Sequence, residues 1–381
     1  MSDRITFDIC VIGAGIAGAS VGAELAADRS VIVLEQESQP GYHTTGRSAA
    51  LFSTTYGPPV IRALSRASEA FYLAPPEGFA NAPLLAPRGA LLIAREDQLA
   101  NLDALERELA GQAGVTRLDA VAARRLLPAL RDTYCAGAIL EDQARDIDVH
   151  ALHQGYLRML KARGGEVATG HAVQAIERTT DGWRIVCRGR TIDARIIVNA
   201  AGAWADEIAS LAGVAKVGLM PKRRTAAMIA APDGAVVSDW PMAIDIDEQF
   251  YMKPDAGRLL ISPADETPSP PCDAQPDEYD VAVAVDRIET AFDIEVRRIE
   301  NKWAGLRSFV ADKCPVAGWT PDAPGFFWLA GQGGYGIQTA PALSRLAASM
   351  VRGARMPADI EEFGVEPTAL SAGRDALNIT N

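Results

Sequence analysis

Three glycines near the amino terminus have the spacing of a phosphate-binding turn. Gly13, Gly15 and Gly18 form G-x-G-x-x-G directly after the strand-like run 8–12, and they open a helix-forming run. The first glycine permits a tight turn, the second lets the backbone approach a pyrophosphate, and the third lets helix and strand pack closely. The amino terminus of the helix then offers unpaired N–H groups and its positive dipole end to the phosphates.

An acidic residue lies where a dinucleotide site needs one. Glu35 follows the second strand-like run, 30–34, and a carboxylate there accepts hydrogen bonds from ribose hydroxyls and repels a 2′-phosphate. The next loop, GYHTTGRSAA at 41–50, is rich in small and hydroxyl residues that could wrap a second phosphate and lie against a flat ring. These features predict a bound dinucleotide and favour FAD over NAD.

Two arginines have the chemistry to bind the carboxylate of a small acid. Arg224 begins a strand-like run, and Arg307 lies among apolar residues in the segment WAGLRSF. A planar guanidinium grips a carboxylate through two parallel hydrogen bonds. Tyr56, in a loop that could form a mobile lid, and Tyr251, on a strand-like run, could add hydroxyl donors. From the residues alone, structural ion pairs for the arginines and core packing for the tyrosines remain open alternatives.

The elements that must position these residues alternate in type along the chain. Strand and helix patterns alternate at both ends and in the middle, whereas residues 224–262 consist of short strand-like runs punctuated by Pro and Gly. This order predicts an α/β fold, in which a Rossmann-type FAD-binding domain is interrupted by an antiparallel-sheet substrate domain. The expected boundaries are 1–82, 146–219 and 306–381 for the FAD-binding domain, and 83–145 and 220–305 for the substrate domain.

Composition excludes several classes of protein. The chain has 381 residues with a formal net charge of −12, which argues against nucleic-acid binding. No apolar run reaches the ~18 residues of a membrane span. Five dispersed cysteines indicate reduced thiols, and four histidines argue against a multi-histidine metal site. We therefore expect a cytoplasmic protein without a metal, as a monomer or small homo-oligomer, with peripheral attachment to the inner membrane left open.

Several segments together resemble a known family of flavoenzymes. The glycine turn, the segment NAAGAW at 199–204 and the segment GQGGYG at 331–336 resemble the D-amino-acid oxidase/glycine oxidase superfamily of FAD-dependent oxidoreductases. The segments GYHTTGRSAA, PKRRTA, FYMKPDAG, WAGLRSFVAD and GQGGYGIQT are similar to D-arginine dehydrogenase and related bacterial D-amino-acid dehydrogenases. The similarity runs over nearly the whole chain, with its motifs in the same order.

The resemblance implies a set of cofactor-binding residues. Glu35 would bind the adenosine ribose, Val173 would contact adenine, and the turn 200–202 would touch the cofactor. The other expected contacts are Gly13, Gly15, Ile16, Ala17, Gly18, Gln36, Thr44, Thr45, Arg47, Ser48, Ala49, Ala50, Ala200, Ala201, Gly202, Trp204, Arg307, Gly333, Gly334, Tyr335, Gly336, Ile337, Gln338 and Thr339. Cys314 lies in a setting unlike the covalent attachment site of sarcosine oxidases, so the expected cofactor is non-covalent FAD.

The resemblance also implies a reaction, the oxidative deamination of D-amino acids by hydride transfer from Cα to flavin N5. Arg224, Arg307, Tyr56 and Tyr251 would bind the substrate, and a backbone carbonyl near Gly334 would accept from its amine. The final electron acceptor would be a quinone or oxygen.

The sequence departs from D-arginine dehydrogenase at two positions. Leu51 replaces a histidine, and Ala90 replaces the acidic residue poised for the substrate guanidinium. Without that carboxylate a cationic substrate side chain would be left unpaired, at a cost of ~2–5 kcal/mol. We therefore expect apolar or small D-amino acids to be preferred over arginine and lysine.

Two alternatives remain open. A flavoenzyme that oxidises a 2-hydroxy acid of the 2-hydroxyglutarate type would offer the same carboxylate to Arg224 and Arg307. Such an enzyme needs a base, which Leu51 does not provide. The other alternative is a flavin-carrying subunit of a heteromeric amine dehydrogenase with little activity of its own.

Overall fold

The first βαβ unit has the geometry that the glycine motif predicts. The computed structural model describes residues 4–377, and it begins with β1 (Arg4–Ile12), α1 (Ile16–Leu25) and β2 (Val31–Leu34). β1 and β2 pair in parallel, with Ile9 opposite Val31. Both strands are fully buried at their carboxyl ends, which explains why they read as continuous apolar runs.

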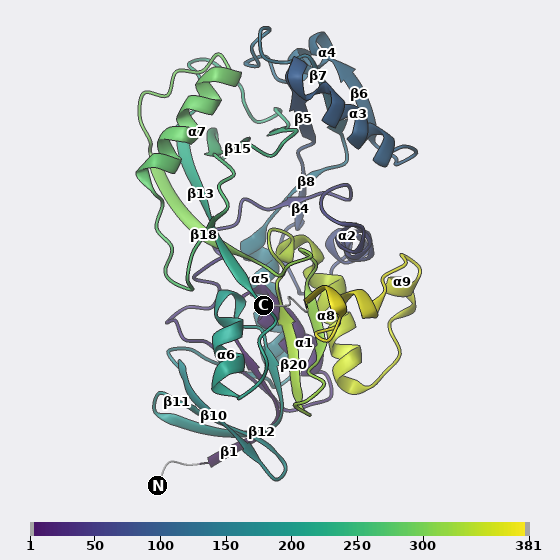
Figure 1. The fold of residues 1–381 in the computed structure, drawn as a ribbon, viewed down its shortest axis with the longest axis vertical. Coiled ribbons are helices and arrows are strands. Elements are labelled where there is room, and N and C mark those ends of the chain that lie inside the picture. Colours follow the sequence, from purple (N-terminus) through teal and green to yellow (C-terminus); the bar gives the residue numbers. More distant parts are fainter. Residues whose placement is uncertain (1–3, 378–381) are drawn as a thin grey trace.

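These strands lie at the centre of the first large sheet. Its order is β10-β11-β12-β1-β2-β9, and β20 pairs with β12 while β19 pairs with β20. The strands β1, β10, β11, β12 and β20 are labelled in the lower half of Figure 1. The strands β12, β1, β2, β9 and β20 are parallel, as a dinucleotide-binding sheet requires. The remaining strands of the sheet are β9 (Glu166–Ala168), β10 (Val173–Thr179), β11 (Gly182–Cys187), β12 (Arg190–Asn199), β19 (Val316–Trp319) and β20 (Phe326–Ala330).

Helices cover one face of this sheet. Buried Val11, Val33 and Phe327 from the strands pack with Leu160 and Leu343 from the helices in one apolar core. The burial of this apolar surface is the main force that holds the layer together. The covering helices are α1, α2 (Pro59–Leu73), α5 (Val149–Ala162) and α8 (Gly336–Arg352), whereas α6 (Ala205–Leu211) packs near β10 and β12.

The second large sheet occupies the upper half of Figure 1. Its order is β17-β13-β16-β15-β14-β5-β7-β6, with β18 paired to β13, and only the β14–β5 pair is parallel. The strands are β5 (Ala90–Ala94), β6 (Val115–Asp119), β7 (Gly137–Glu141), β13 (Met220–Ala230), β14 (Met242–Asp245), β15 (Tyr251–Asp255), β16 (Arg258–Ser262), β17 (Thr267–Pro268) and β18 (Asn301–Phe309). The sequence analysis correctly predicted short, mainly antiparallel strands here.

Three helices pack on the second sheet, and a small sheet lies between the two large ones. The helices are α3 (Leu99–Glu108), α4 (Ala120–Leu126) and α7 (Glu278–Ala291), and the small sheet has the order β3-β8-β4. Its strands are β3 (Leu51–Phe52), β4 (Leu85–Pro87) and β8 (Arg145–Ile147). The other elements are η1 (Glu96–Gln98), η2 (Gly202–Trp204), α9 (Ala358–Glu361), η3 (Pro367–Leu370) and η4 (Asp375–Leu377).

The two sheets agree with the predicted α/β fold class. The chain enters the second sheet at β5 and again at β13, near the expected starts at 83 and 220. β18 spans the expected boundary at 306, so Arg307 belongs to a strand of the second sheet. The division into two domains with the stated boundaries stays a prediction.

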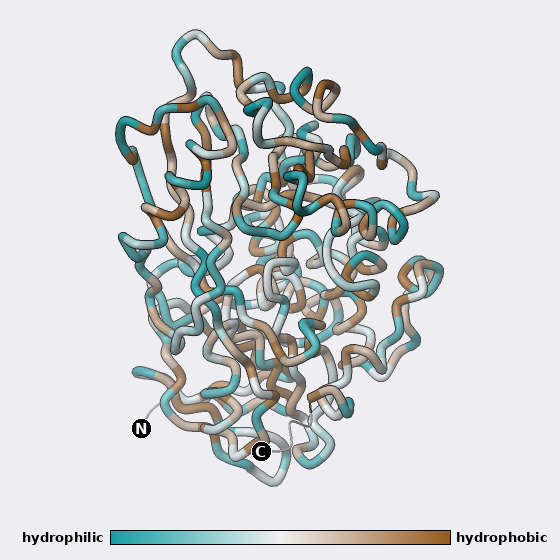
Figure 2. The backbone as a smooth tube through the Cα atoms, turned by 45° about the horizontal axis from the view of Figure 1, so that its top comes forward, coloured by the Kyte–Doolittle hydropathy of each residue, from teal (hydrophilic) through white to brown (hydrophobic). Residues whose placement is uncertain are grey.

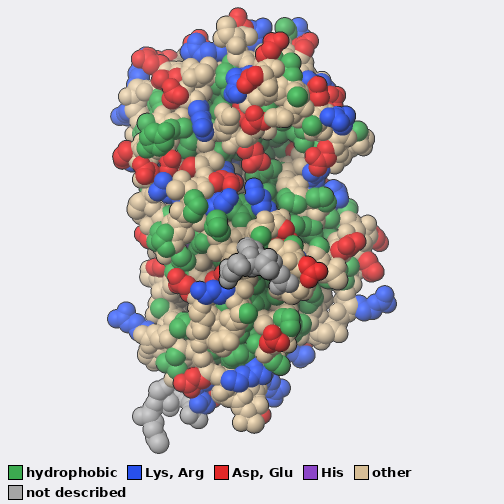
Figure 3. All heavy atoms as spheres, viewed as in Figure 1, with side chains coloured by type: hydrophobic (Ala, Val, Ile, Leu, Met, Phe, Trp, Pro, Cys, Tyr) green, Lys and Arg blue, Asp and Glu red, His purple; other side chains and the backbone are tan. Residues whose placement is uncertain are grey.

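The surface and the hydropathy pattern are those of a protein with buried cores. Hydrophobic segments run through the inside of the layers, and hydrophilic segments follow the outer loops (Figure 2). Acidic and basic side chains are interspersed over the face seen in Figure 3. No helix within residues 4–377 has both the length and the apolar composition needed to cross a bilayer. Residues 4–377 also contain no cluster of three His, Cys, Asp or Glu side chains that could hold a metal ion.

Candidate active site

The glycine turn after β1 leaves no space for side chains. Gly13 has φ +99°, and a Cβ atom there would lie 2.5 Å from the carbonyl oxygen of Ala200. A Cβ on Gly18 would lie 1.8 Å from the carbonyl oxygen of Gly13. These contacts give the physical reason for two glycines of the motif. The turn therefore brings backbone N–H groups of the α1 amino terminus to the edge of an open groove.

Glu35 supports this turn as well as facing the groove. Its carboxylate accepts hydrogen bonds from the backbone N–H groups of Ala14 at 2.9 Å and Glu37 at 3.0 Å. Each carboxylate oxygen can accept more than one hydrogen bond, so ribose hydroxyls can still bind there. The backbone of the glycine turn therefore fixes the position of the Glu35 carboxylate, which in turn stabilises the turn.

The 41–50 loop reaches the same helix terminus. Thr45 Oγ1 accepts from the backbone N–H of Ile16 at 3.0 Å, and Thr44 Oγ1 donates to the carbonyl of Leu306 at 2.8 Å. A Cβ on Gly15 would lie 3.2 Å from Thr45 Oγ1, so the loop packs closely over the glycine turn. The loop thus joins the first sheet to β18.

A buried histidine that the sequence analysis missed lies beneath this loop. His153 on α5 is 4% exposed, and its Nε2 lies 2.8 Å from the carbonyl oxygen of Ala14. A Cβ on Gly41 would lie 2.8 Å from its ring. His153 therefore supports both the glycine turn and the 41–50 loop. No local sequence pattern distinguishes His153 as a functional residue, because it lies on the buried face of an amphipathic helix, where its position is explained by core packing.

Two adjoining cavities form one elongated groove along these loops. They share Gly15, Thr44, Thr45, Ala200, Gly202 and Ala203, and the groove extends from Glu35 to Gly336. Its length and its glycine-lined middle suit a dinucleotide. The predicted cofactor contacts that line it are Gly13, Gly15, Ile16, Ala17, Glu35, Gln36, Thr44, Thr45, Arg47, Ser48, Ala49, Val173, Ala200, Ala201, Gly202, Trp204, Arg307, Gly333, Gly334, Gly336 and Ile337.

Five predicted cofactor contacts do not line this groove. Gly18 packs beneath the turn, whereas Ala50 and Gln338 line the neighbouring cavity. Tyr335 is buried against Tyr56. Thr339 is fully buried, and its hydroxyl donates to the carbonyl of Tyr335 at 2.9 Å, so its side chain stabilises the first turn of α8.

Arg47 lines the groove, but its guanidinium group binds other residues of the protein. Nη1 donates to the carbonyls of Ala274 and Ala304, each at 2.9 Å, and Nη2 pairs with Asp273. The backbone carbonyl of Arg47 accepts from Trp303 Nε1 at 3.0 Å. Arg47 therefore fastens the 41–50 loop to the second sheet and to the 269–277 segment.

The two candidate substrate arginines lie on the same face of a strand pair. In the β13–β18 register, Arg224 is opposite Gly305 and Lys222 is opposite Arg307. Directly opposed residues and residues two apart share a face, so Arg224 and Arg307 are diagonal neighbours. Gly305 leaves space beside them. Both arginines line the groove and also a second cavity next to it.

The surroundings of the two guanidinium groups differ. Arg224 is 8% exposed, and its Nε donates to the carbonyl of Asp265 at 2.8 Å while Nη2 lies 3.4 Å from Glu266. Burial, and then the charge of Arg307, lower the pKa of Arg224. Burial also disfavours the charge of Arg307, but Tyr56, Tyr251 and Glu248 give its pKa a net upward shift. Two neighbouring cations in a partly dry site favour an anionic ligand.

The cavity beside the arginines also contains the two candidate tyrosines and the Gly334 backbone. A Cβ on Gly334 would lie 2.8 Å from Arg307 Nη1, so this glycine lets the guanidinium pack against the backbone. Tyr251 on β15 is 6% exposed and lines the cavity with Tyr56. The sequence analysis named these residues, and the structure brings them together. Their roles stay predictions.

Tyr56 and Arg307 line the same cavity, and each shifts the pKa of the other. Burial raises the pKa of the Tyr56 hydroxyl, Arg307 lowers it, and Glu248 raises it further. The net rise keeps the hydroxyl protonated, and therefore a donor, over the neutral range. Its ring packs against Tyr335 with centroids 5.0 Å apart. Glu248, on the turn between β14 and β15, was missed by the sequence analysis and lines the same cavity.

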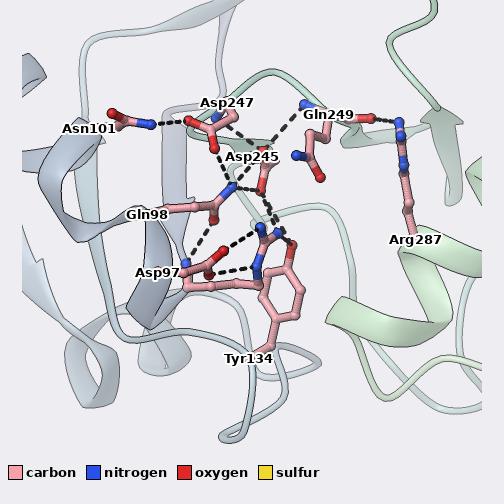
Figure 4. A network of polar contacts seen from close by, with 9 residues as sticks. Asp97, Gln98, Asn101, Tyr134, Asp245, Asp247, Gln249 and Arg287 are labelled. Atoms are coloured by element: carbon pink, nitrogen blue, oxygen red, sulfur yellow. Dashed lines mark hydrogen bonds and ion pairs between the residues drawn. The ribbon is translucent and has the colours of Figure 1, made fainter.

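The β14–β15 turn that carries Glu248 is fixed by a buried carboxylate. Asp245 is fully buried and accepts from Gln98 Nε2 at 3.1 Å and from the Asp247 N–H at 3.0 Å (Figure 4). Tyr134 donates to the same carboxylate at 3.3 Å. This network connects the turn to η1 and α3, and it holds Glu248 in a left-handed conformation with φ +54°.

Comparison with known proteins adds a family and a fold. The sequence family described as FAD dependent oxidoreductase, or DAO, matches residues 8–350. Glycine oxidase of Geobacillus kaustophilus (strain HTA426) is 24% identical over 380 residues, which cover 94% of this chain and 96% of the relative. FAD-dependent oxidoreductase domain-containing protein 1 of Mus musculus is 23% identical over 90% of this chain and 81% of the relative. Its Xenopus laevis namesake is 26% identical over 42% of this chain, and the match spans 36% of that relative.

Solved structures share the fold over nearly the whole chain. The structure of glycine oxidase from Geobacillus kaustophilus has a TM-score of 0.83 at 22% identity, over 97% of this chain and 99% of that chain. L-alpha-glycerophosphate oxidase from Mycoplasma pneumoniae, solved with FAD bound, has a TM-score of 0.82 at 16% identity, over 91% of this chain and 95% of that chain. None of these relatives is a D-arginine dehydrogenase, so closeness to that enzyme stays a prediction.

The environment of His153 predicts a pH-dependent stability. Burial holds the pKa of His153 below its usual 6.5, so below that pH the unfolded chain binds a proton that the folded chain does not. Stability is therefore lost as pH falls from 6.5 towards the lowered pKa, by up to about 1.4 kcal/mol per pH unit from this residue. Chemical denaturation at several pH values should show this slope in the wild type and a shallower one in His153→Gln.

The control for this comparison is His150→Gln, at an exposed position of the same helix. Its unfolding free energy should follow the wild-type pH dependence closely, because His150 is the smallest of the causes that act on the pKa of His153. Parallel pH profiles for His153→Gln and the wild type would contradict the assignment.

The contacts of Arg47 predict a role in cofactor retention. Arg47→Ala removes hydrogen bonds worth ~0.5–1.5 kcal/mol each, so the dinucleotide should bind about 10-fold more weakly. Dialysis followed by measurement of bound chromophore checks this. Arg29→Ala, which removes an exposed pair with Asp28, is the control. Equal retention in both variants would show that the Arg47 contacts do not maintain the groove.

Proposed function

The chain belongs to the DAO family of FAD-dependent oxidoreductases, and from this premise we propose that it deaminates D-amino acids with apolar or small side chains. FAD is the cofactor, and when bound it accepts a hydride at flavin N5. The observation that carries the proposal is the convergence of Arg224 and Arg307 on one face between the dinucleotide groove and the neighbouring cavity. The D configuration rests on the resemblance to D-amino-acid dehydrogenases.

The two guanidinium groups would bind the α-carboxylate of the substrate. Asp265 and Glu266 hold Arg224 in place, and Gly334 backs Arg307, so neither group needs to be ordered when the substrate binds. Tyr56 and Tyr251 supply hydroxyl donors beside them. A carboxylate fixed in this way orients Cα–H towards the groove, which is the positioning that hydride transfer requires.

The amine would lie near the Gly334 backbone, whose carbonyl can accept its hydrogen bonds. Among the described residues, no histidine lines the substrate cavity or the part of the groove beside the arginines. The carboxylates there are Glu141, which accepts hydrogen bonds from residues 53–55, and Glu248, whose charge acts on Arg307. The amine can lose its proton to solvent before the hydride leaves. Water then hydrolyses the imino acid to a keto acid and ammonia.

The walls of the cavity favour an apolar substrate side chain. Beyond the arginines they are formed by Ala90 and by Leu51, Leu92, Leu105, Met242, Ile244, Ile246 and Phe250. The expectation that this pocket lacks a carboxylate was wrong, because Glu141 lies directly opposite Ala90 in the β5–β7 register and lines the cavity. Its oxygens already accept hydrogen bonds from residues 53–55, so it offers little to a cationic substrate. Glu248 also lines the cavity, but its charge already acts on Arg307.

The alternatives share the anionic end of the substrate. A 2-hydroxy acid would present the same carboxylate to the two arginines, and a flavin subunit of a heteromeric amine dehydrogenase would need partner chains for turnover. We favour the amino-acid reaction because a hydroxyl group requires a base. Leu51 supplies none, and the two carboxylates of the cavity already interact with the protein, Glu141 with residues 53–55 and Glu248 with Arg307. Quinone or oxygen as the acceptor, and a monomer or small homo-oligomer, stay predictions.

Anaerobic reduction of the flavin tests the substrate class. D-Leucine, D-methionine and D-phenylalanine should bleach it at least about 30-fold more efficiently than D-arginine or D-lysine, since an unpaired buried cation costs ~2–5 kcal/mol. The L enantiomers and 2-hydroxy acids, measured in parallel, should leave the spectrum unchanged. Faster bleaching by D-arginine would refute the apolar preference, and bleaching by 2-hydroxy acids alone would favour the alternative reaction.

A further inference from the structure

A buried carboxylate that the proposed reaction does not use lies behind the Tyr56 loop. Glu141 ends β7 and is 3% exposed. No Lys, Arg or His in the described part of the chain forms an ion pair with it. A carboxylate buried in this way needs hydrogen-bond donors that compensate for its lost hydration.

All of those donors come from the three residues before Tyr56. Ser53 Oγ donates to the carboxylate at 2.7 Å, Thr55 Oγ1 at 2.6 Å, and the backbone N–H of Thr54 at 3.0 Å. Charge-assisted hydrogen bonds of this kind are about twice as strong as neutral ones. The loop that could have been a mobile lid is therefore bound to β7 at three successive residues.

The hydrogen bonds continue from this loop to Tyr56 itself. Ser53 Oγ, which donates to Glu141, accepts from the backbone N–H groups of Thr55 at 3.3 Å and Tyr56 at 3.2 Å. The Ser53 N–H in turn donates to Gln338 Oε1 at 3.3 Å, which ties the loop to α8. The backbone of Tyr56 is thus set by Ser53, whose hydroxyl is oriented by Glu141.

We propose that Glu141 is a positioning residue, which holds Tyr56 so that its hydroxyl meets Arg307 and the carboxylate of the substrate. This inference rests on the proposed function, because it assigns Tyr56 and Arg307 to substrate binding. In this proposal Glu141 acts through Tyr56, which lies 85 positions away from it in the sequence.

The chemistry requires a carboxylate rather than an amide at this position. Glutamine would present an NH₂ group to one set of these donors. Ser53 Oγ already accepts two backbone N–H groups, so it cannot readily accept a third hydrogen bond from that amide. In the other orientation the amide NH₂ would face the Thr54 N–H, which is also a donor, so Glu141→Gln breaks at least one of the connections to residues 53–55 while it keeps the size of the side chain.

The test is a double-mutant cycle between Glu141→Gln and Tyr56→Phe. The substrate dissociation constant is obtained from anaerobic flavin reduction at a series of D-leucine concentrations. We expect each single variant to raise it about 10-fold, and the double variant to bind no more weakly than the weaker single, within about 2-fold. Glu141→Asp, which keeps the charge, should restore part of the affinity.

Glu289→Gln is the matched control. Glu289 is a partly buried glutamate on α7 that accepts the Val296 N–H at 2.8 Å and lines neither cavity. It should lower thermal stability without changing the dissociation constant. If Glu141→Gln only lowers stability in the same way, or if its effect multiplies with that of Tyr56→Phe, Glu141 does not act through Tyr56 and the proposal is overturned.

Two further outcomes are kept distinct. If Glu141→Gln does not fold, Thr55→Val removes a single donor and enters the same cycle with the same expected non-additivity. If no D-amino acid reduces the wild-type flavin, the proposed function fails, and a 2-hydroxy acid that does reduce it serves as the ligand for the cycle. Additive effects contradict only the role of Glu141.

Discussion

The site depends on two like charges held close together in a partly dry cavity. Arg224 and Arg307 lie diagonally on one face of the β13–β18 pair, and burial together with the charge of Arg307 lowers the pKa of Arg224. Glu266 partly compensates the charge of Arg224, and Glu248 that of Arg307, and an anionic ligand would add to this compensation at the point where both groups are already held in place. Asp265 and Glu266 restrain the first, and Gly334 gives the second a flat backbone surface.

The remaining architecture places this pair against the cofactor. The glycine turn and Glu35 fix the dinucleotide groove at the carboxyl ends of β1 and β2, and Arg47 fastens the groove to the strands that carry the arginines. Two buried carboxylates then hold two segments of the wall of the substrate cavity. Asp245 anchors the turn with Glu248, and Glu141 anchors the loop with Tyr56. Each uses backbone N–H or hydroxyl donors, which fix loop geometry better than apolar packing does.

How far the sequence predicts this site depends on the range of each interaction. The glycine turn and Glu35 could be predicted, because their constraints act within one βαβ unit. Arg224 and Arg307 stood out by their surroundings and by resemblance, but their shared face follows from a strand register that no local pattern specifies. Glu141, His153 and the partners of Arg47 pair across 86, 139 and 227 positions, and no spacing rule marks contacts at such separations. Thr339 does not line the groove, because its hydroxyl donates to the carbonyl of Tyr335 just before α8, and its contact with the cofactor stays a prediction.

The most direct test of the central claim compares two ligands that differ at one group, the anionic carboxylate of D-leucine and the neutral carboxamide of D-leucinamide. Rapid-reaction anaerobic kinetics would measure flavin reduction by D-leucine and by D-leucinamide in the wild type and in Arg307→Leu. If the guanidinium binds the carboxylate, the substitution should slow reduction by D-leucine at low concentration at least about 100-fold and leave the reaction of the uncharged amide within a few fold. An equal loss for both ligands would contradict the account, because Arg307 would then support the cavity without binding the anion.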